Sequence, residues 1–284
     1  EGKWWHPTWH KPLLGKYSLS DPIVISKHVD FATGHGVNCF FIDTQWNNFE
    51  KISEVVTNSL FFEKGVVFAL LYNSITSPSL KKIDGWKIDF NDENNIKGLK
   101  EDFYIIATKF FNHPNYLKVN NKPVVYLYFS HGYVGNVDKA ISSLREFLEK
   151  NFNISPYLLS DVVERYHPLH PLHTNNIDEL TKAVLSYDGI TLWGGGFSGQ
   201  PTFIGGNYEE QLKSLFSLSL KIGIKNKKGV MLSFKNGENS SLVPWGSKVI
   251  LPRSPELFKE RLEISLKYIE NYPYFVSIRI DTWD

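Results

Sequence analysis

The chain has 284 residues, of which 42% are hydrophobic, and its formal net charge at neutral pH is +1. This length and composition can bury a large core, and the near-zero charge gives no sign of nucleic-acid binding. No run approaches the roughly 20 apolar residues of a membrane-spanning helix, so no membrane span is expected. The single cysteine, Cys39, excludes an internal disulfide and is expected to be a buried core thiol.

Seven apolar runs of strand length follow one another along the chain. They occupy residues 36–42, 64–72, 122–130, 155–160, 187–193, 228–234 and 274–280. Because these runs are continuously apolar rather than alternating, they are typical of strands buried on both faces, as in parallel sheets.

Helical segments are expected between these runs. The first starts at Asp21-Pro22, where an N-cap residue precedes a proline, and ends near Gly34. Further helices are expected at 95–111, 137–150, 176–185, 208–222 and from Ser254-Pro255 to about 271. This alternation predicts an α/β fold with a parallel sheet, in a single domain over residues 1–284.

Seven strands are one fewer than a (β/α)8 TIM-type barrel requires. We expect the first barrel strand to precede residue 1 and the last one to lie at the C-terminus. A doubly wound open sheet is the alternative, but no glycine-rich fingerprint follows any of the runs. The glycine-rich segment 194–206 lacks the Lys-Ser/Thr pair of a phosphate loop and is expected to be a long loop over the strand ends.

In such a barrel the residues that directly follow each strand form the active face. They are Asp43, Gln45, Trp46, Tyr72, Asn73, Tyr128, Ser130, His131, Tyr133, Asp161, Glu164, Trp193, Glu238, Asp281, Trp283 and Asp284. Carboxylates beside aromatic rings are typical of glycoside hydrolysis, in which one acid protonates the leaving oxygen and another acts as base, nucleophile or charge stabiliser. The alternative interpretation is that these acids cap the helices that follow the strands.

A histidine motif, "HPLHPLH", occupies residues 167–173. Proline at a period of three predicts a polyproline II segment, which would place His167, His170 and His173 on one side. Successive residues on that side lie about 9 Å apart, too far to share one zinc ion without bending. A structured surface loop without metal is therefore expected.

Several segments of the chain resemble one family of glycosidases. Residues 17–46, "YSLSDPIVISKHVDFATGHGVNCFFIDTQW", resemble the opening of glycoside hydrolase family 99 and the related WbsX-like glycan-processing proteins. The most specific match is "FFNHPNYLKVNNKPVVYLY" at 110–128, and residues 187–193 and 252–269 also fit. The resemblance implies a (β/α)8 barrel that acts on glycans, with endo-α-mannosidase as the type activity.

The resemblance also implies that the catalytic acids follow the last strand, where this chain reads "DTWD". One alignment matches Trp283 and puts Asp284 at an asparagine position of the family motif, so that both glutamates fall beyond the chain. A second alignment pairs Asp281 and Asp284 with the two glutamates. Glu238, in "SFKNGENSS", is a further candidate one strand earlier.

The resulting hypothesis is a glycoside hydrolase that cleaves internal α-linkages of a mannose-containing or related polysaccharide, without cofactor or metal. The candidate acids are Asp43, Glu238, Asp281 and Asp284, and the candidate sugar-binding residues are Trp5, Trp9, Trp46, Asn73, Tyr128, Trp193 and Trp283. An extracellular or cell-surface location is expected from the start at Glu1 and from the sequons at Asn153 and Asn239. The alternatives are a non-catalytic carbohydrate-binding or structural protein and an unrelated α/β enzyme with a histidine metal site.

Overall fold

A computed structural model describes residues 17, 21–56, 65–167, 170–193, 208–239 and 250–281. Seven parallel strands form its central sheet, in the spatial order β1-β2-β6-β8-β9-β10-β13. Their bounds are β1 Cys39–Asp43, β2 Val67–Asn73, β6 Lys122–Tyr128, β8 Tyr157–Ser160, β9 Gly189–Thr191, β10 Gly229–Lys235 and β13 Val276–Asp281. All seven predicted strands are confirmed, and every residue of β8, β9 and β10 is buried, as expected for a covered parallel sheet.

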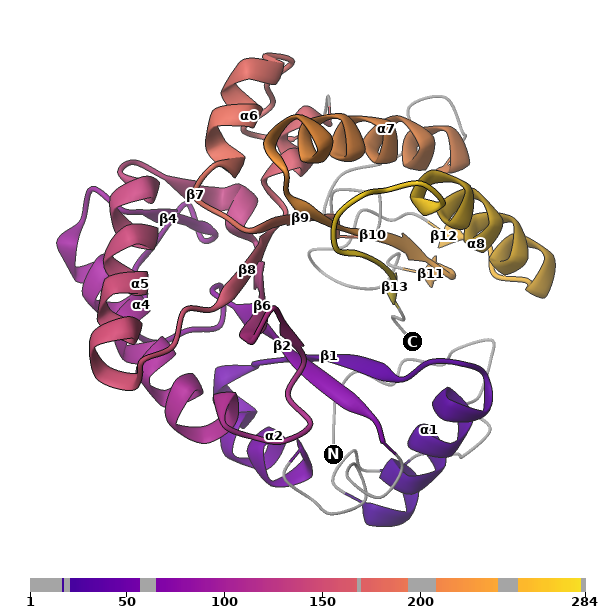
Figure 1. The fold of residues 1–284 in the computed structure, drawn as a ribbon, viewed down its shortest axis with the longest axis horizontal. Helices are drawn as coiled ribbons and strands as arrows, with labels where there is room; N and C mark the ends of the chain where they lie inside the picture. The colour runs from indigo at the N-terminus through magenta and orange to yellow at the C-terminus, as the bar shows by residue number, and fades with distance from the viewer. Residues whose placement is uncertain are drawn as a thin grey trace.

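Helices lie around the outside of the strands (Figure 1). They are α1 Pro22–Gly34, α2 Phe49–Val56, α4 Glu93–Ile106, α5 Val137–Phe152, α6 Ile177–Val184, α7 Tyr208–Asn226 and α8 Pro255–Ile269. The cap signals read from the sequence operate as expected, since Asp21 accepts a hydrogen bond from the Ile23 N–H at 2.9 Å and Ser254 accepts one from the Leu257 N–H at 3.2 Å. None of the helices in the described ranges is both long and apolar enough to cross a membrane.

Some elements were not predicted. Helix α2 fills the first β–α unit, and a small sheet of β3 (Lys82–Ile83), β4 (Lys87–Asp89) and β7 (Tyr133–Val134) joins the segments that follow β2 and β6. Two further short hairpins are β5 (Lys118–Val119) with β6, and β11 (Glu238–Asn239) with β12 (Ile250–Leu251). Strands of two or three residues are too short to show a periodic pattern, so they could not be predicted from the sequence.

The α/β class with a parallel sheet is confirmed, but closure into a full barrel is not. In the described residues the strands form a half-barrel whose edges are β1 and β13, and no ladder joins those two strands. The expected eighth strand stays a prediction, and the glycine-rich segment 194–206 lies outside the described ranges.

The edge position of β1 corrects one expectation, because all five of its residues are only partly buried. Cys39 is a free, half-buried thiol rather than a core residue. Burial still raises the pKa of this thiol to about 11, so it is protonated at neutral pH.

Gly98 sets how closely α4 approaches the segment after β2. A Cβ atom at this position would lie 2.1 Å from the Ser79 carbonyl oxygen. We expect Gly98→Ala to lower the free energy of unfolding by about 2 kcal/mol, although alanine is the better helix former. Urea denaturation measures this loss. Gly34→Ala, at the end of α1, is the control, because a Cβ there meets nothing within 4 Å. Equal stability of the two variants would contradict this packing argument.

Candidate active site

The carboxyl ends of the seven parallel strands meet at one edge of the sheet, as the sequence predicted. Residues at or just beyond these ends are Asp43 (β1), Asn73 (β2), Tyr128 to His131 (β6), Asp161 and Glu164 (β8), Trp193 (β9), Lys235 (β10) and Asp281 (β13). In α/β barrels this edge carries the active site.

Asp43 and Asn73 come together at the ends of the adjacent strands β1 and β2. The Asn73 amide Nδ2 donates to both Asp43 carboxylate oxygens, at 3.1 and 3.2 Å. The Asn73 backbone N–H in turn donates to the Thr44 hydroxyl at 3.0 Å, which fixes the start of the loop. Burial raises the pKa of Asp43 to about 6, while hydrogen bonds from Asn73 and Gln45 act in the opposite direction. Asp43 can therefore exchange a proton near neutral pH, as acid–base catalysis requires.

Tyr128 and Trp193 form an aromatic pair at the ends of β6 and β9. Their ring centroids are 4.2 Å apart with an interplanar angle of 37°. Each side chain has an exposed fraction of 7%, so the pair forms the floor of the strand-end region rather than an open surface. Trp46, predicted with them, is partly buried and stacks on Phe49 at 4.8 Å, beside the Asp43 loop.

Two cationic side chains lie against the Trp193 ring. The Lys235 Nζ is 5.9 Å from the ring centroid, and the Arg279 guanidinium carbon is 5.5 Å from it and 5.4 Å from the Tyr126 ring. These cation–π distances place positive charge beside the aromatic floor. Neither residue was a candidate. Arg279 lies within the run 274–280, which was interpreted as a buried strand, and Lys235, which directly follows the run 228–234, was not among the strand-end residues selected.

Glu164 was among the residues expected at the strand ends, but it was not chosen as a candidate catalytic or sugar-binding residue. It lies in η4 (Val162–Tyr166), a 3₁₀ turn after β8, and is 1% exposed. Its Oε1 accepts a hydrogen bond from the Trp193 backbone N–H at 2.7 Å, whereas Oε2 has no hydrogen-bond partner in the described residues. Burial raises the pKa of Glu164 to about 7. A buried acid with such a pKa at a strand end is a typical functional-site feature.

Asp161, three residues before Glu164, holds the turn after β6. Its carboxylate accepts hydrogen bonds from the Tyr126 hydroxyl, the Phe129 N–H, the Ser130 hydroxyl and the His131 N–H, at 2.7 to 3.1 Å. Phe129 has a positive φ of 65°, a conformation that an aromatic residue adopts only where surrounding contacts impose it. Burial alone would raise the pKa of Asp161, but His131 and these donors outweigh it and hold the pKa below its usual value.

The histidine motif forms turns rather than polyproline II, so that prediction was wrong. The His170 N–H donates to the His167 carbonyl at 2.9 Å, and the His173 N–H donates to the His170 carbonyl at 2.8 Å. Polyproline II has no such internal bonds. The His170 ring is buried, and its centroid lies 5.0 Å from that of the His131 ring. Both histidine rings lie 6.0 Å from the Trp86 ring. Burial lowers the pKa of His170 to about 3. In the described ranges no three His, Cys, Asp or Glu side chains could together hold a metal ion.

Several predicted site residues cannot be placed as side chains. Trp5, Trp9, Trp283 and Asp284 lie outside the described ranges. For Glu238 and Asp281 only the backbone is described: Glu238 pairs with Leu251 in the β11–β12 hairpin, and Asp281 ends β13 beside Lys235. Asp43 is thus the one of the four candidate catalytic acids whose side-chain geometry is described.

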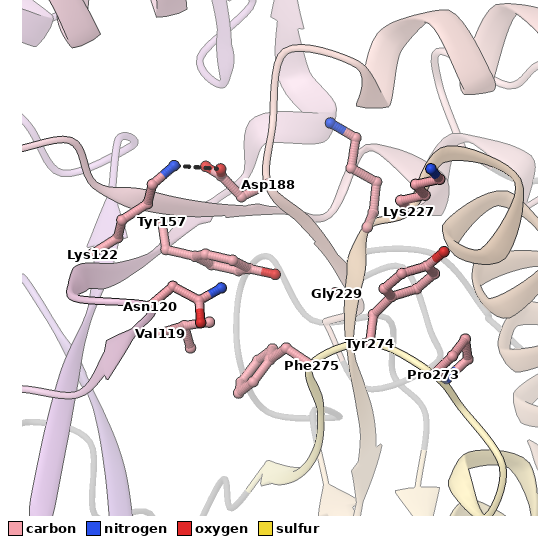
Figure 2. Close-up of a pocket in the computed structure, with 11 residues that line it drawn as sticks. Val119, Asn120, Lys122, Tyr157, Asp188, Lys227, Gly229, Pro273, Tyr274 and Phe275 are labelled. Carbon is pink, nitrogen blue, oxygen red and sulfur yellow. Dashed lines mark ion pairs between the residues drawn. The ribbon is translucent and has the colours of Figure 1, made fainter.

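A cavity of about 400 Å³ lies at the opposite edge of the sheet, where strands begin. Figure 2 shows the rings of Tyr157 and Phe275 beside it, together with the ion pair between Lys122 and Asp188. Asp188 is also satisfied by the Arg145 guanidinium at 2.6 Å, so its charge is balanced by structural contacts. The amino-terminal edge of an α/β barrel serves stability, and we do not assign this cavity to the active site.

Neither a protein-family model nor a curated protein sequence matches this chain. Among solved structures, the GH99 endo-α-mannosidase from Bacteroides thetaiotaomicron superposes with a TM-score of 0.60 at 16% sequence identity. The match covers 94% of this chain and 69% of the mannosidase chain. The fold is therefore GH99-like. The resemblance inferred from sequence is confirmed at the level of the fold.

Two further solved structures superpose on this chain. The same mannosidase in complex with bis-tris-propane gives a TM-score of 0.59 at 17% identity, covering 94% of this chain and 73% of the other. A broad-specificity GH5-4 endoglucanase from Clostridium longisporum gives a TM-score of 0.54 at 12% identity, covering 92% and 76%. The open half-barrel of this chain is thus similar in fold to glycosidases, and specificity has to be argued from the side chains.

Proposed function

We propose that this chain is a glycoside hydrolase that cleaves internal α-linkages of a mannose-containing or related polysaccharide. The observation that carries the proposal is Asp43, a partly buried acid with a pKa raised to about 6, held by Asn73 at the carboxyl edge of a glycosidase fold. Its location outside the cell or on the cell surface stays a prediction.

In this proposal Asp43 is the proton donor to the leaving glycosidic oxygen. Its raised pKa keeps the carboxyl group partly protonated at mildly acidic pH, and the Asn73 amide fixes its orientation. Glycoside hydrolysis needs a second carboxylate as base, nucleophile or stabiliser. The candidates are Glu238 on β11, Asp281 at the end of β13, and Asp284, which comes three residues later in the sequence.

The glycan-binding part of the proposal rests on the aromatic floor. The Tyr128–Trp193 pair offers apolar ring area. Asn73, the ladder partner of Tyr128, and Lys235, over the Trp193 ring, add polar groups beside it. Apolar rings with a few placed polar groups are typical of ligand sites. The α-mannoside preference is taken from the similarity of the fold to an endo-α-mannosidase.

The test is to incubate the purified protein with α-mannan and with a β-1,4-glucan, and to follow chain length by chromatography. We expect a rapid fall in α-mannan chain length, as internal cleavage produces, and no change in the β-glucan. Proton NMR of the first products reports retention or inversion at the anomeric carbon. Binding of α-mannan without any product would contradict the enzyme proposal and favour a carbohydrate-binding protein. Cleavage of the β-glucan alone would contradict the proposed linkage.

A further inference from the structure

Asp161 is the residue directly before the 3₁₀ turn η4, which contains Glu164. The two carboxyl groups contact the segments that follow two different strands. Asp161 accepts hydrogen bonds from the Phe129 and His131 N–H groups, in the turn that directly follows Tyr128 at the end of β6. Glu164 accepts a hydrogen bond from the Trp193 N–H, after β9. Strand β8 lies between β6 and β9, so the two carboxyl groups bond to the backbone directly after Tyr128 and to the backbone of Trp193 itself.

The two carboxyl groups differ in how completely they are satisfied. Asp161 has four hydrogen-bond donors shared between its two oxygens, and its pKa is held below the usual value. Glu164 has one donor, and its buried Oε2 has no hydrogen-bond partner in the part of the chain that is described. A buried polar atom of this kind calls for a specific explanation, such as a bound proton or a missing ligand.

The charges around Glu164 come from each element that packs against it. Asp161 on its own turn opposes its ionisation, whereas His131 from η3 (Ser130–Gly132) and Lys235 from β10 favour it. Arg279 from β13 lies over the Trp193 ring on the same floor. Burial outweighs these charges and leaves the Glu164 pKa at about 7, so its proton exchanges in the physiological range.

We propose that Asp161 and Glu164 form a carboxylate brace for the Tyr128–Trp193 pair, in which Asp161 is a fixed anchor and Glu164 is a proton-dependent support of Trp193. Both are positioning residues, since they act through the aromatic rings. A hydrogen bond to an ionised carboxylate is about twice as strong as one to a neutral group. Trp193 should thus be held more firmly when Glu164 has lost its proton. The glycan as ligand rests on the proposed function, but the brace itself does not.

The first experiment measures binding of an α-mannooligosaccharide by titration calorimetry between about pH 5.5 and 8.5, a range that spans the Glu164 pKa. We expect the affinity of the wild-type chain to rise severalfold with pH, with a midpoint near 7. Glu164→Gln keeps an acceptor for the Trp193 N–H but cannot ionise, so its affinity should not change over this range. Glu164→Leu leaves that N–H unsatisfied and should bind about tenfold more weakly throughout.

The second experiment needs no glycan. The emission of Trp193 is obtained as the difference between the spectra of the wild-type chain and a Trp193→Phe variant. We expect this emission to change with a midpoint near pH 7 in the wild-type chain and to show no such midpoint in Glu164→Gln. If the chain binds no glycan but the emission follows Glu164, the proposed function fails while the brace stands.

Asp188→Asn is the matched control for both experiments. Asp188 also accepts a backbone N–H, that of Leu158 at 3.0 Å, but it lies at the amino-terminal edge of the sheet. We expect this variant to lose stability without losing glycan affinity or the emission midpoint. Glycan affinity that is independent of pH in the wild-type chain would overturn the brace. So would a Glu164→Gln variant that binds like the wild type at every pH but no longer hydrolyses, because Glu164 would then serve the chemistry.

Discussion

Replacing Asp43 by asparagine should lower the rate of glycan hydrolysis by about 100- to 10,000-fold, the range that a general acid contributes. Asparagine has nearly the same shape and can still bond to Asn73, but it holds no transferable proton. The pKa of Asp43 rises from 3.8 to about 6 on folding, so ionisation of Asp43 at neutral pH costs the folded chain more free energy than the unfolded chain. At neutral pH a neutral asparagine should therefore leave stability unchanged or increase it. Initial rates on α-mannan together with urea denaturation separate the two effects.

The pH dependence of the rate tests the same assignment. If Asp43 donates the proton, the rate of wild-type hydrolysis falls as the pH rises through about 6. The remaining rate of Asp43→Asn should not show this alkaline decrease. Asn73→Ala removes hydrogen bonds that lower the Asp43 pKa, so the alkaline decrease of the rate should move to higher pH. Full activity of Asp43→Asn would remove Asp43 from the chemistry. If the rate of Asn73→Ala decreases at the same pH as that of the wild type, another group causes the decrease.

Replacing Asp161 by leucine should lower the free energy of unfolding by about 3–5 kcal/mol, close to the cost of breaking a buried charged network. Four donors would lose their acceptor: the hydroxyls of Tyr126 and Ser130 and the N–H groups of Phe129 and His131. Each buried donor left unsatisfied costs about 1–3 kcal/mol before relaxation. Urea denaturation with an unchanged m-value measures the loss.

Two controls bracket this prediction. Ser130→Ala removes one of the four donors and also the hydroxyl that accepts from the Asp161 N–H, and it should cost about 2 kcal/mol. Asp161→Asn keeps one acceptor oxygen and should fall between the two. Because the folded pKa of Asp161 lies below 3.8, its ionic contribution is present above pH 3.8 and is lost as the pH falls through the folded value. The stability gap between the wild type and Asp161→Asn should therefore shrink in acid. A loss below about 1 kcal/mol in Asp161→Leu would show that the turn after β6 does not depend on this carboxylate.

The strands were predictable because their signal is local. A run such as "KGVMLSF" is apolar without alternation, and only a strand covered on both faces needs such a run. The matching helix starts rest on equally local chemistry, as Asp21 and Ser254 show. The β3–β4–β7 sheet could not be found in this way, because its pairing of Ile88 with Tyr133 joins short segments far apart in the chain.

The grouping of the candidate residues at one edge of the sheet was predictable in part. That Asp43, Asn73, Tyr128 and Trp193 would share one edge follows from parallel strands ending together. The importance of Glu164 did not follow, because an acid in "DVVERY" has the same local pattern as a surface acid.

The sequence by itself determined the order of strands and helices, the class of fold and the edge at which polar side chains gather, since each depends on short-range periodicity and chain direction. Only the tertiary structure decided which acids are buried and which donors they meet. Asp161 and Glu164 stand three residues apart, yet one is held ionised by four donors and the other has a single one. Protonation depends on burial and on groups brought from other strands, and neither is encoded next to the residue itself.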